Sequence, residues 1–311
     1  MDSWLFFLRS TGSAAINKDT LHNPYYGNVP KFLIAMGAFV WSSALAMSFE
    51  KTPDNLSRFG FKNERGGAHA SRTIMLNELG KLLSYFDRPD ATKADYFQAI
   101  DENNCLAKRS GKTRILTCRH LVDLYTLDPS FVLFRALLFF WHRDPDCRTL
   151  VALLCAYSRD SILRSATPFI LGTIAGTTIT RESVEACIDE CEPGRFSPAT
   201  LKSTAQNINS SFTQAGLLTG KVRKIRTRAN PTSGAVSYAL LLGYLSGARG
   251  ESLFQTEYTK LLDCSFERAL SLAEDASRRG WIVFKRVGDV IEVVFPNLIT
   301  AEEMEWVREQ S

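Results

Sequence analysis

Two neighbouring segments in the middle of the chain are apolar on nearly every side of a helix. They cover residues 130–141 and 147–157 and leave almost no position at which a helix could face water. Because such helices must be surrounded by other elements, we expect both in the centre of a helical core. The 311-residue chain, 45% of it apolar, is long enough to bury a core of this kind.

Helical spacing of apolar residues extends over most of the chain, and strand-like alternation is confined to a few short places. The segment 68–86 carries one apolar face and has a candidate cap at Ser71. The segment 110–127 carries another and stops before Asp128-Pro129. We therefore predict a mainly α protein that begins with a helical bundle over residues 1–172.

The helix signals become more specific after residue 172. Thr180 is a candidate cap for a helix running to about Cys191, and Ser197 followed by Pro198 marks the start of a second helix. The apolar residues of this second helix form one stripe, which consists of Leu201, Ala205, Ile208, Phe212 and Ala215. The opposite face is predicted to present polar side chains, which are Lys202, Gln206, Asn209 and Ser210.

A basic ribbon at 221–228 follows this helix, after a turn at Thr219-Gly220. The chain has no acidic residue between Glu192 and Glu251, although it places eight lysines and arginines there. Since the whole chain carries a formal charge of only +4, one surface is expected to be polarised toward a polyanion. Helix, helix and basic ribbon is the order of a winged-helix DNA-binding module, which we predict for residues 173–250.

A helix that presents lysine and glutamine fits a groove of duplex DNA, while ribbon cations neutralise the flanking phosphates. Single-stranded DNA and RNA stay open as alternatives. A second cationic site, between Asn104 and Val122, also lacks acids and is either a second phosphate track or a solvated helix face. The predicted DNA-binding residues are Arg195, Lys202, Gln206, Lys221, Arg223, Lys224, Arg226 and Arg228, with Lys108, Arg109, Lys112 and Arg114 at the second site.

Residues 251–311 repeat the plan without the positive charge. Two helices are predicted at 253–262 and 265–280, followed by a hairpin that turns at Val287-Gly288-Asp289. The tail after Pro296 is net acidic and amphipathic, which predicts a closing helix. Because its charges are mixed in sign, this C-terminal winged-helix-like module is expected to have a structural or partner-binding role.

No pattern in the chain demands catalysis, a metal or a cofactor. Gly111-Lys112-Thr113 resembles the end of a phosphate-binding loop, but the preceding glycine and strand are missing. Cys187 and Cys191 have no further ligands at metal-binding spacing. Asn23-Pro24-Tyr25-Tyr26 lacks the second proline of an amino-methyltransferase turn. Three further polar residues are expected to cap helix ends, namely His142, Asp144 and Asp146.

Seven scattered cysteines and the absence of a secretory signal after Met1 favour a reducing, cytoplasmic location. The segment 32–49 has eighteen residues without a charge, which is the lower limit for a membrane span. Gly37 and three serines dilute it, so an interior helix is favoured and membrane association is kept as an alternative.

Four stretches of the chain carry a resemblance to a known family: Asp101 to Lys108, Arg119 to Pro129, Arg195 to Lys202 and Gln214 to Leu218. In them the chain resembles the BrxA-like proteins of bacterial BREX bacteriophage-exclusion loci. The resemblance spans about Ala68 to Phe295 at the level of motifs, and the first 67 residues lie outside it. It implies a mainly helical, DNA-binding accessory subunit of winged-helix character without a catalytic site, acting beside a methyltransferase, a phosphatase-like protein and ATPases.

The expected function is therefore that of a non-catalytic DNA-binding subunit of an antiviral defence system, with other BREX or defence proteins as partners. Two alternatives stay open. One is a transcriptional regulator of a defence operon, and the other is a membrane-associated protein that uses segment 32–49.

Overall fold

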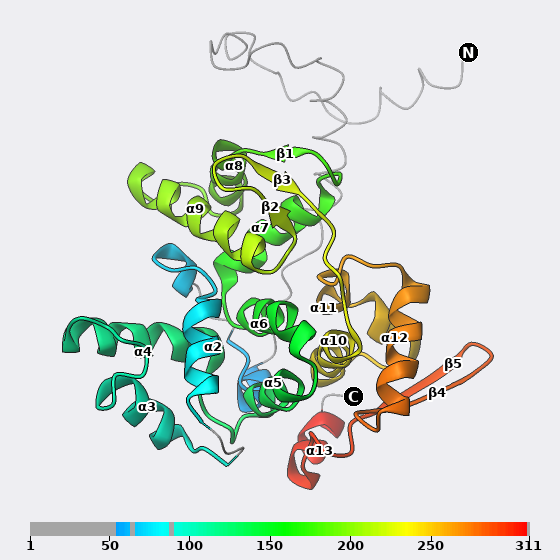
Figure 1. The fold of residues 1–311 in the computed structure, drawn as a ribbon. Helices are drawn as coiled ribbons and strands as arrows, with labels where there is room; N and C mark the ends of the chain where they lie inside the picture. The colour runs from blue at the N-terminus through cyan, green and yellow to red at the C-terminus, as the bar shows by residue number, and fades with distance from the viewer. Residues whose placement is uncertain (1–53, 63–65, 87–89, 310–311) are drawn as a thin grey trace, which may run out of the picture. The chain divides into compact units, whose positions relative to one another are not determined.

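The computed structural model of the chain describes residues 54–62, 66–86 and 90–309 (Figure 1). These residues are mainly helical with a few short antiparallel strands, so the predicted fold class is confirmed at this level. The apolar segment 32–49 and the turn Asn23 to Tyr26 lie outside the described residues. Within the described part of the chain, no helix is both long and apolar enough to cross a lipid bilayer.

The first part of the described chain, up to Gly172, consists of helices joined by short loops. The predicted helix 68–86 is divided, because Met75 takes a left-handed backbone conformation and α2 starts only after it. Ser71 follows a short 3-10 helix instead of capping α2. Ser110 does cap its helix, by accepting the N–H of Thr113. The elements are η3 (Asp54–Phe59), η4 (Ala68–Ala70), α2 (Leu76–Ser84), α3 (Lys93–Asp101), α4 (Gly111–Tyr125), α5 (Val132–Arg143), η5 (Pro145–Cys147), α6 (Arg148–Tyr157) and α7 (Ser161–Gly172).

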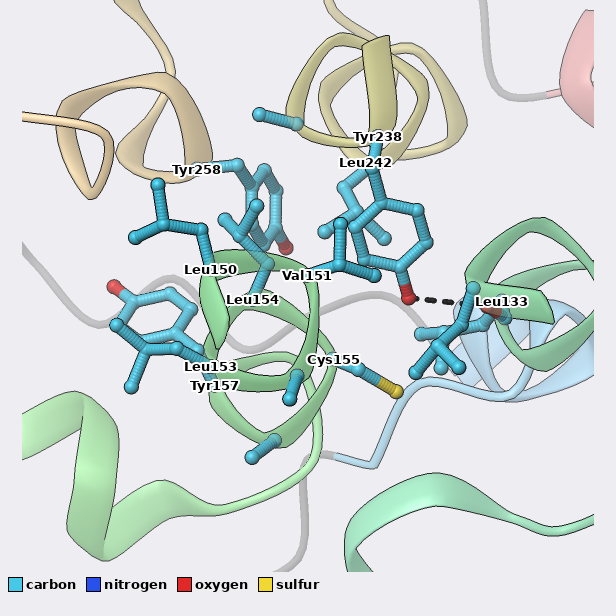
Figure 2. Packing of buried hydrophobic residues seen from close by; sticks show 14 of the residues in the cluster. Leu133, Leu150, Val151, Leu153, Leu154, Cys155, Tyr157, Tyr238, Leu242 and Tyr258 are labelled. Atoms are coloured by element: carbon cyan, nitrogen blue, oxygen red, sulfur yellow. Dashed lines mark hydrogen bonds between the residues drawn. The ribbon is translucent and has the colours of Figure 1, made fainter. Parts of the chain in front are cut away.

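The core is centred on α5, α6 and a later helix, α10 (Ser233–Leu245). The prediction that segments 130–141 and 147–157 are central is confirmed, since every residue of α6 from Leu150 to Tyr157 is buried. α10 packs against both α5 and α6. Figure 2 shows Tyr238 of α10 reaching over α6, where its hydroxyl donates a 3.0 Å hydrogen bond to the carbonyl of Leu133.

The N-terminus of α10 is held by Asp144, one of the three residues predicted to cap helix ends. One oxygen of its carboxylate accepts the hydroxyl of Thr232 at 2.6 Å and the N–H of Gly234 at 2.9 Å. An added Cβ at position 234 would lie 2.7 Å from that same oxygen, so a larger residue there would displace the Asp144 carboxylate. The residue between α5 and η5 thus determines where the central helix α10 begins.

The middle of the chain forms a three-stranded antiparallel sheet with two helices between its first two strands in sequence. Its elements are β1 (Thr178–Ile179), α8 (Arg181–Cys191), α9 (Pro198–Gln214), β2 (Leu218–Thr219) and β3 (Lys224–Arg226). Both predicted caps are confirmed: Thr180 accepts the N–H of Ser183 and Ser197 that of Thr200. The strand order is β1-β3-β2, so the last strand pairs with both others.

The last part of the described chain is α10 followed by η6 (Gly250–Gln255), α11 (Glu257–Lys260), α12 (Phe266–Arg278), β4 (Val283–Val287), β5 (Val290–Val294) and α13 (Ala301–Arg308). The predicted hairpin is confirmed, with Val287 opposite Val290 across a turn at Gly288-Asp289. The predicted closing helix is α13, which Arg135 of α5 holds through two bonds to Glu303 of 2.6 and 2.7 Å. α10 packs against α11 and α12 as well as α5 and α6, so its contacts cross both predicted module boundaries.

All seven cysteines are free thiols and none is exposed. Four of them are buried, which agrees with the expectation of thiols embedded in apolar surroundings. Burial raises the pKa of the Cys155 thiol to about 12, so it stays protonated and unreactive near neutral pH.

Candidate nucleic-acid interface

The candidate interface is carried by α9 and by the loop between β2 and β3. α9 packs against α8 on one side. At its end, a turn of three residues leads into β2. β3 returns beside β2, with Leu218 opposite Arg226 and Thr219 opposite Ile225. Because β2 and β3 are paired, the two ends of loop 220–223 are held close together near the end of α9.

The outer face of α9 presents Lys202 and Gln206, both exposed and one helical turn apart. The inward stripe is as predicted, with Ala205, Ile208 and Phe212 fully buried. Asn209 is a correction, because its side chain is buried instead of facing water, while Ser210 is half-buried. The polar face open to a groove is thus confined to the first half of α9.

The loop between β2 and β3 is a tight turn with a fully solvated tip. Gly220 has a φ of +94°, and an added Cβ would lie 2.1 Å from the carbonyl oxygen of Arg223, so only glycine fits. Lys221, Val222 and Arg223 are all exposed, and Val222 is 99% exposed. The Nε of Arg223 donates a 3.1 Å hydrogen bond to the hydroxyl of Thr178, which holds the guanidinium group beside β1.

Lys224 starts β3 and folds back toward the turn. Its ammonium donates to the carbonyl of Gly220 at 2.7 Å, and partial burial lowers the pKa of this amine. Arg228, just beyond β3, is exposed. Lys224 therefore adds to the positive charge around the loop, whereas Arg228 lies toward the opposite end of the β2–β3 pair and lines a hollow with Asp263.

Arg226 was predicted as a surface cation, and this is the main correction to the predicted site. Only 2% of it is exposed, and it donates to the carbonyls of Ile170 at 2.8 Å and Leu217 at 3.3 Å. Its guanidinium also pairs with Asp263 at 2.9 Å. Arg226 thus ties the sheet to α7 and to the turn after α11, and it presents no charge to a ligand.

Arg195 lies in the turn before α9 and is already paired. Its guanidinium forms a salt bridge with Glu192 and stacks on the ring of Phe196 at 4.8 Å. Because the neighbouring carboxylate neutralises it, Arg195 contributes less to the surface field than Lys202 or the loop cations.

The second predicted cationic site is split by internal salt bridges. Lys108 pairs with Glu78 at 3.1 Å, and Arg114 pairs with Asp101 at 3.6 Å. Arg109 and Lys112 are exposed, and no carboxylate among the described residues lies within ion-pair distance of either. Half of this predicted phosphate track is therefore already neutralised within the fold.

A buried polar trio was not predicted from the sequence. The Nδ1 of His69 lies 2.8 Å from Asp160, and its Nε2 lies 2.9 Å from the hydroxyl of Ser211. Burial opposes ionisation of Asp160, but the His69 ring and the backbone N–H groups of His69 and Leu163 lower its pKa.

This trio has the hydrogen-bond order of a serine hydrolase triad without its exposure. His69 and Ser211 are 0% exposed and Asp160 is 1% exposed. The Ser211 oxygen accepts the N–H of Ile74 at 3.0 Å and lies 2.8 Å from the carbonyl of Asn207. Because no substrate atom can reach a fully buried hydroxyl, the arrangement acts as a clasp between residues 69–74, α7 and α9.

No protein-family model matches this chain, and no curated protein matches it.

Proposed function

We propose that this protein binds double-stranded DNA without catalysing a reaction, as an accessory subunit of an antiviral phage-exclusion system. The observation that carries the DNA-binding part is the set of exposed cations on α9 and the β2–β3 loop, in a stretch of chain without a carboxylate. These cations are Lys202 of α9 and Lys221 and Arg223 of the loop, and Arg228 beyond β3 is a further exposed cation of the same stretch.

The order of elements supports a winged-helix interpretation of residues 161–226. A helix, α7, comes first, then strand β1, helices α8 and α9, and the antiparallel strands β2 and β3. Winged-helix proteins use this order, place the first strand beside the last, and set their third helix in a groove of DNA. By this correspondence α9 is the groove helix and the loop 220–223 is the wing.

The charge distribution supports contacts to the phosphate backbone more than base reading. Lys202 and Gln206 are the polar side chains that the first half of α9 offers to a groove, whereas the loop and Arg228 offer cations alone. Each phosphate neutralised should contribute about −0.9 to the slope of log affinity against log salt concentration. Four such contacts predict a slope of about −3.6 and substantial non-specific binding.

The place in a defence system rests on the resemblance to BrxA-like proteins. Its strongest stretch, Arg195 to Lys202, forms the turn and first residues of α9, where the proposed DNA contacts begin. A subunit that holds DNA but carries no reactive site suits a system in which separate methyltransferase and ATPase subunits perform the chemistry.

The test is a salt-titrated mobility shift with duplex DNA, single-stranded DNA and RNA probes. The variant Lys221→Glu/Arg223→Glu/Arg228→Glu should lose duplex affinity by at least about a hundredfold, since three attractive contacts become repulsive. The matched control makes the same charge change at exposed cations elsewhere, as Lys81→Glu/Arg268→Glu/Arg286→Glu, and should lose less than about fivefold.

Equal losses in the two triple variants, or unchanged retention in the first, would remove the proposal. Preference for one sequence over random DNA by at least about a thousandfold would instead indicate a transcriptional regulator. Tighter binding of single strands or RNA than of duplex would replace the proposed ligand.

A further inference from the structure

Helix α4 has an exposed face that the proposed DNA contacts do not use. Ile115 is 60% exposed and Leu116 is 39% exposed, although the other side of the helix buries Thr117, Cys118 and Leu121. Exposure of two neighbouring aliphatic side chains to water is unfavourable. Burying them against the apolar surface of a partner would therefore stabilise a complex.

Two cations frame these apolar residues. Lys112 and Arg119 stand three residues before Ile115 and three after Leu116, so the four positions follow the i, i+3, i+4, i+7 spacing of a single helix face. Lys112 and Arg119 are both exposed, and no carboxylate in the described chain lies within ion-pair distance of them. Arg109 adds a third exposed cation just before the helix.

The surrounding charges confirm that this excess is local. The nearest acids in sequence are already paired: Asp101 with Arg114 of α4 at 3.6 Å, and Asp123 with Lys62 at 3.2 Å. The face is therefore apolar at its centre and positive at its ends. Phosphate groups would pair with the ends but would leave the aliphatic centre without a partner, which makes this face a poor DNA track.

We propose that the α4 face formed by Lys112, Ile115, Leu116 and Arg119 docks an acidic amphipathic helix of another protein. At a rise of 1.5 Å per residue the face is about 10 Å long, which matches two turns of a partner helix. Apolar residues at i, i+3 and i+4 of that helix cover Ile115 and Leu116, and its flanking carboxylates meet the two cations. So small a contact predicts a transient complex with a dissociation constant of about 10 to 100 µM.

The first test uses two synthetic helical peptides of fourteen residues and the full-length protein. Both peptides carry one leucine face, and they differ only in having glutamate or lysine beside it. Fluorescence anisotropy should show binding of the glutamate peptide and at least about tenfold weaker binding of the lysine peptide. The variant Lys112→Glu/Arg119→Glu should reverse this preference, and Ile115→Ser/Leu116→Ser should abolish binding of both peptides.

All four substituted side chains are on the exposed face, so thermal unfolding of each variant should match that of the original chain within a few degrees. The matched control is Val222→Ser, which removes an exposed aliphatic group from the β2–β3 loop and should leave peptide binding unchanged. No binding of the glutamate peptide, or equal binding of both peptides, overturns the proposal.

A second test uses photo-cross-linking inside the cells that naturally make the protein and identifies the partner there. A photo-reactive phenylalanine derivative placed at position 115 should cross-link to a segment of another protein that is net acidic and has helical apolar spacing. Cross-links to nucleic acid, to a second copy, to residues 1–53 of the same chain, or to nothing overturn the proposal. The same group at position 222 should cross-link to DNA, so failure there counts against the proposed function and leaves the α4 face unaffected.

Discussion

Residues 161–226 and 233–294 follow one plan but differ in how they treat charge. Each has a first helix, a shorter second helix, a longer third helix and an antiparallel pair of strands. In the first unit the exposed cations of α9 and its loop have no acid in the same stretch of chain. In the second, Asp275 pairs with both Arg278 and Arg279, and Glu292 pairs with Lys285. The order of elements alone therefore does not distinguish the two units, and the proposal of DNA binding rests on the absence of carboxylates in the first.

The two units also differ in how their first helix is anchored. An aspartate holds the start of each: Asp160 accepts two N–H groups of α7, and Asp144 accepts one of α10. Only Asp160 is fully buried and bonded to a histidine that reaches the third helix of its unit. The proposed groove helix is therefore braced by buried polar groups, whereas α12 is joined to the start of α10 by a partly exposed bond, in which the Ser233 hydroxyl donates to Asp275 at 2.6 Å.

The largest expected effect on stability concerns the buried pair between the two units. Arg226→Ala leaves Asp263 without its cation and removes one donor each from the carbonyls of Ile170, Leu217 and Thr227, so it should lower the free energy of unfolding by about 3 to 5 kcal/mol. Urea denaturation measures this loss. The exposed pair of the second unit gives the control, because Lys285→Ala should cost less than about 1 kcal/mol. Similar costs for the two variants would contradict the interior position of Arg226.

A second prediction compares the two anchoring aspartates. Asp160→Asn should destabilise the protein by about 2 to 4 kcal/mol near neutral pH, since a buried, hydrogen-bonded charge is removed beside His69. Asp144→Asn should cost only about 1 kcal/mol, because its carboxylate is partly solvated.

The pH dependence tests the same anchor. The pKa of Asp160 is lowered in the fold, so its charge stabilises the protein above the unfolded value of about 3.9 and this contribution is lost as pH falls through the folded value. The gap between the original chain and Asp160→Asn should therefore shrink as the pH falls below about 4. A gap that stays unchanged in acid would show that the carboxylate is not the stabilising species.

The smallest expected effect separates the two third helices. Lys202→Ala on α9 should weaken duplex binding about fivefold and reduce the salt slope by about 1, because one phosphate contact is lost. Arg268→Ala on α12 should change neither quantity. Mobility shifts at three salt concentrations measure both, and an equal effect of the two substitutions would place DNA on both units.

Local signals in the sequence predicted local structure well. Thr180, Ser197 and Pro198 correctly predicted where helices start. A helix cap depends only on a side chain and on a backbone N–H two or three residues later, so the sequence alone shows both partners. The inward stripe of α9 followed from helical periodicity alone. Each of these features depends on neighbours in the chain, which the sequence displays.

The corrections concern side chains whose partners are distant in sequence. Arg226 looked like one more cation of a basic ribbon, and only the fold brings Asp263, 37 residues away, against it. The clasp of His69 joins residues 91 and 142 positions away, so no spacing rule could indicate it.

The burial of α10 on nearly all sides has a consequence for the order of events during synthesis. α5 and α6 complete their packing only against residues 233–245, which emerge from the ribosome long after residue 157. At about 5 to 20 residues per second, the earlier helices wait on the order of ten seconds with apolar surface in water. Until its central helix arrives, a nascent chain of this protein therefore presents the kind of apolar surface on which chaperones act.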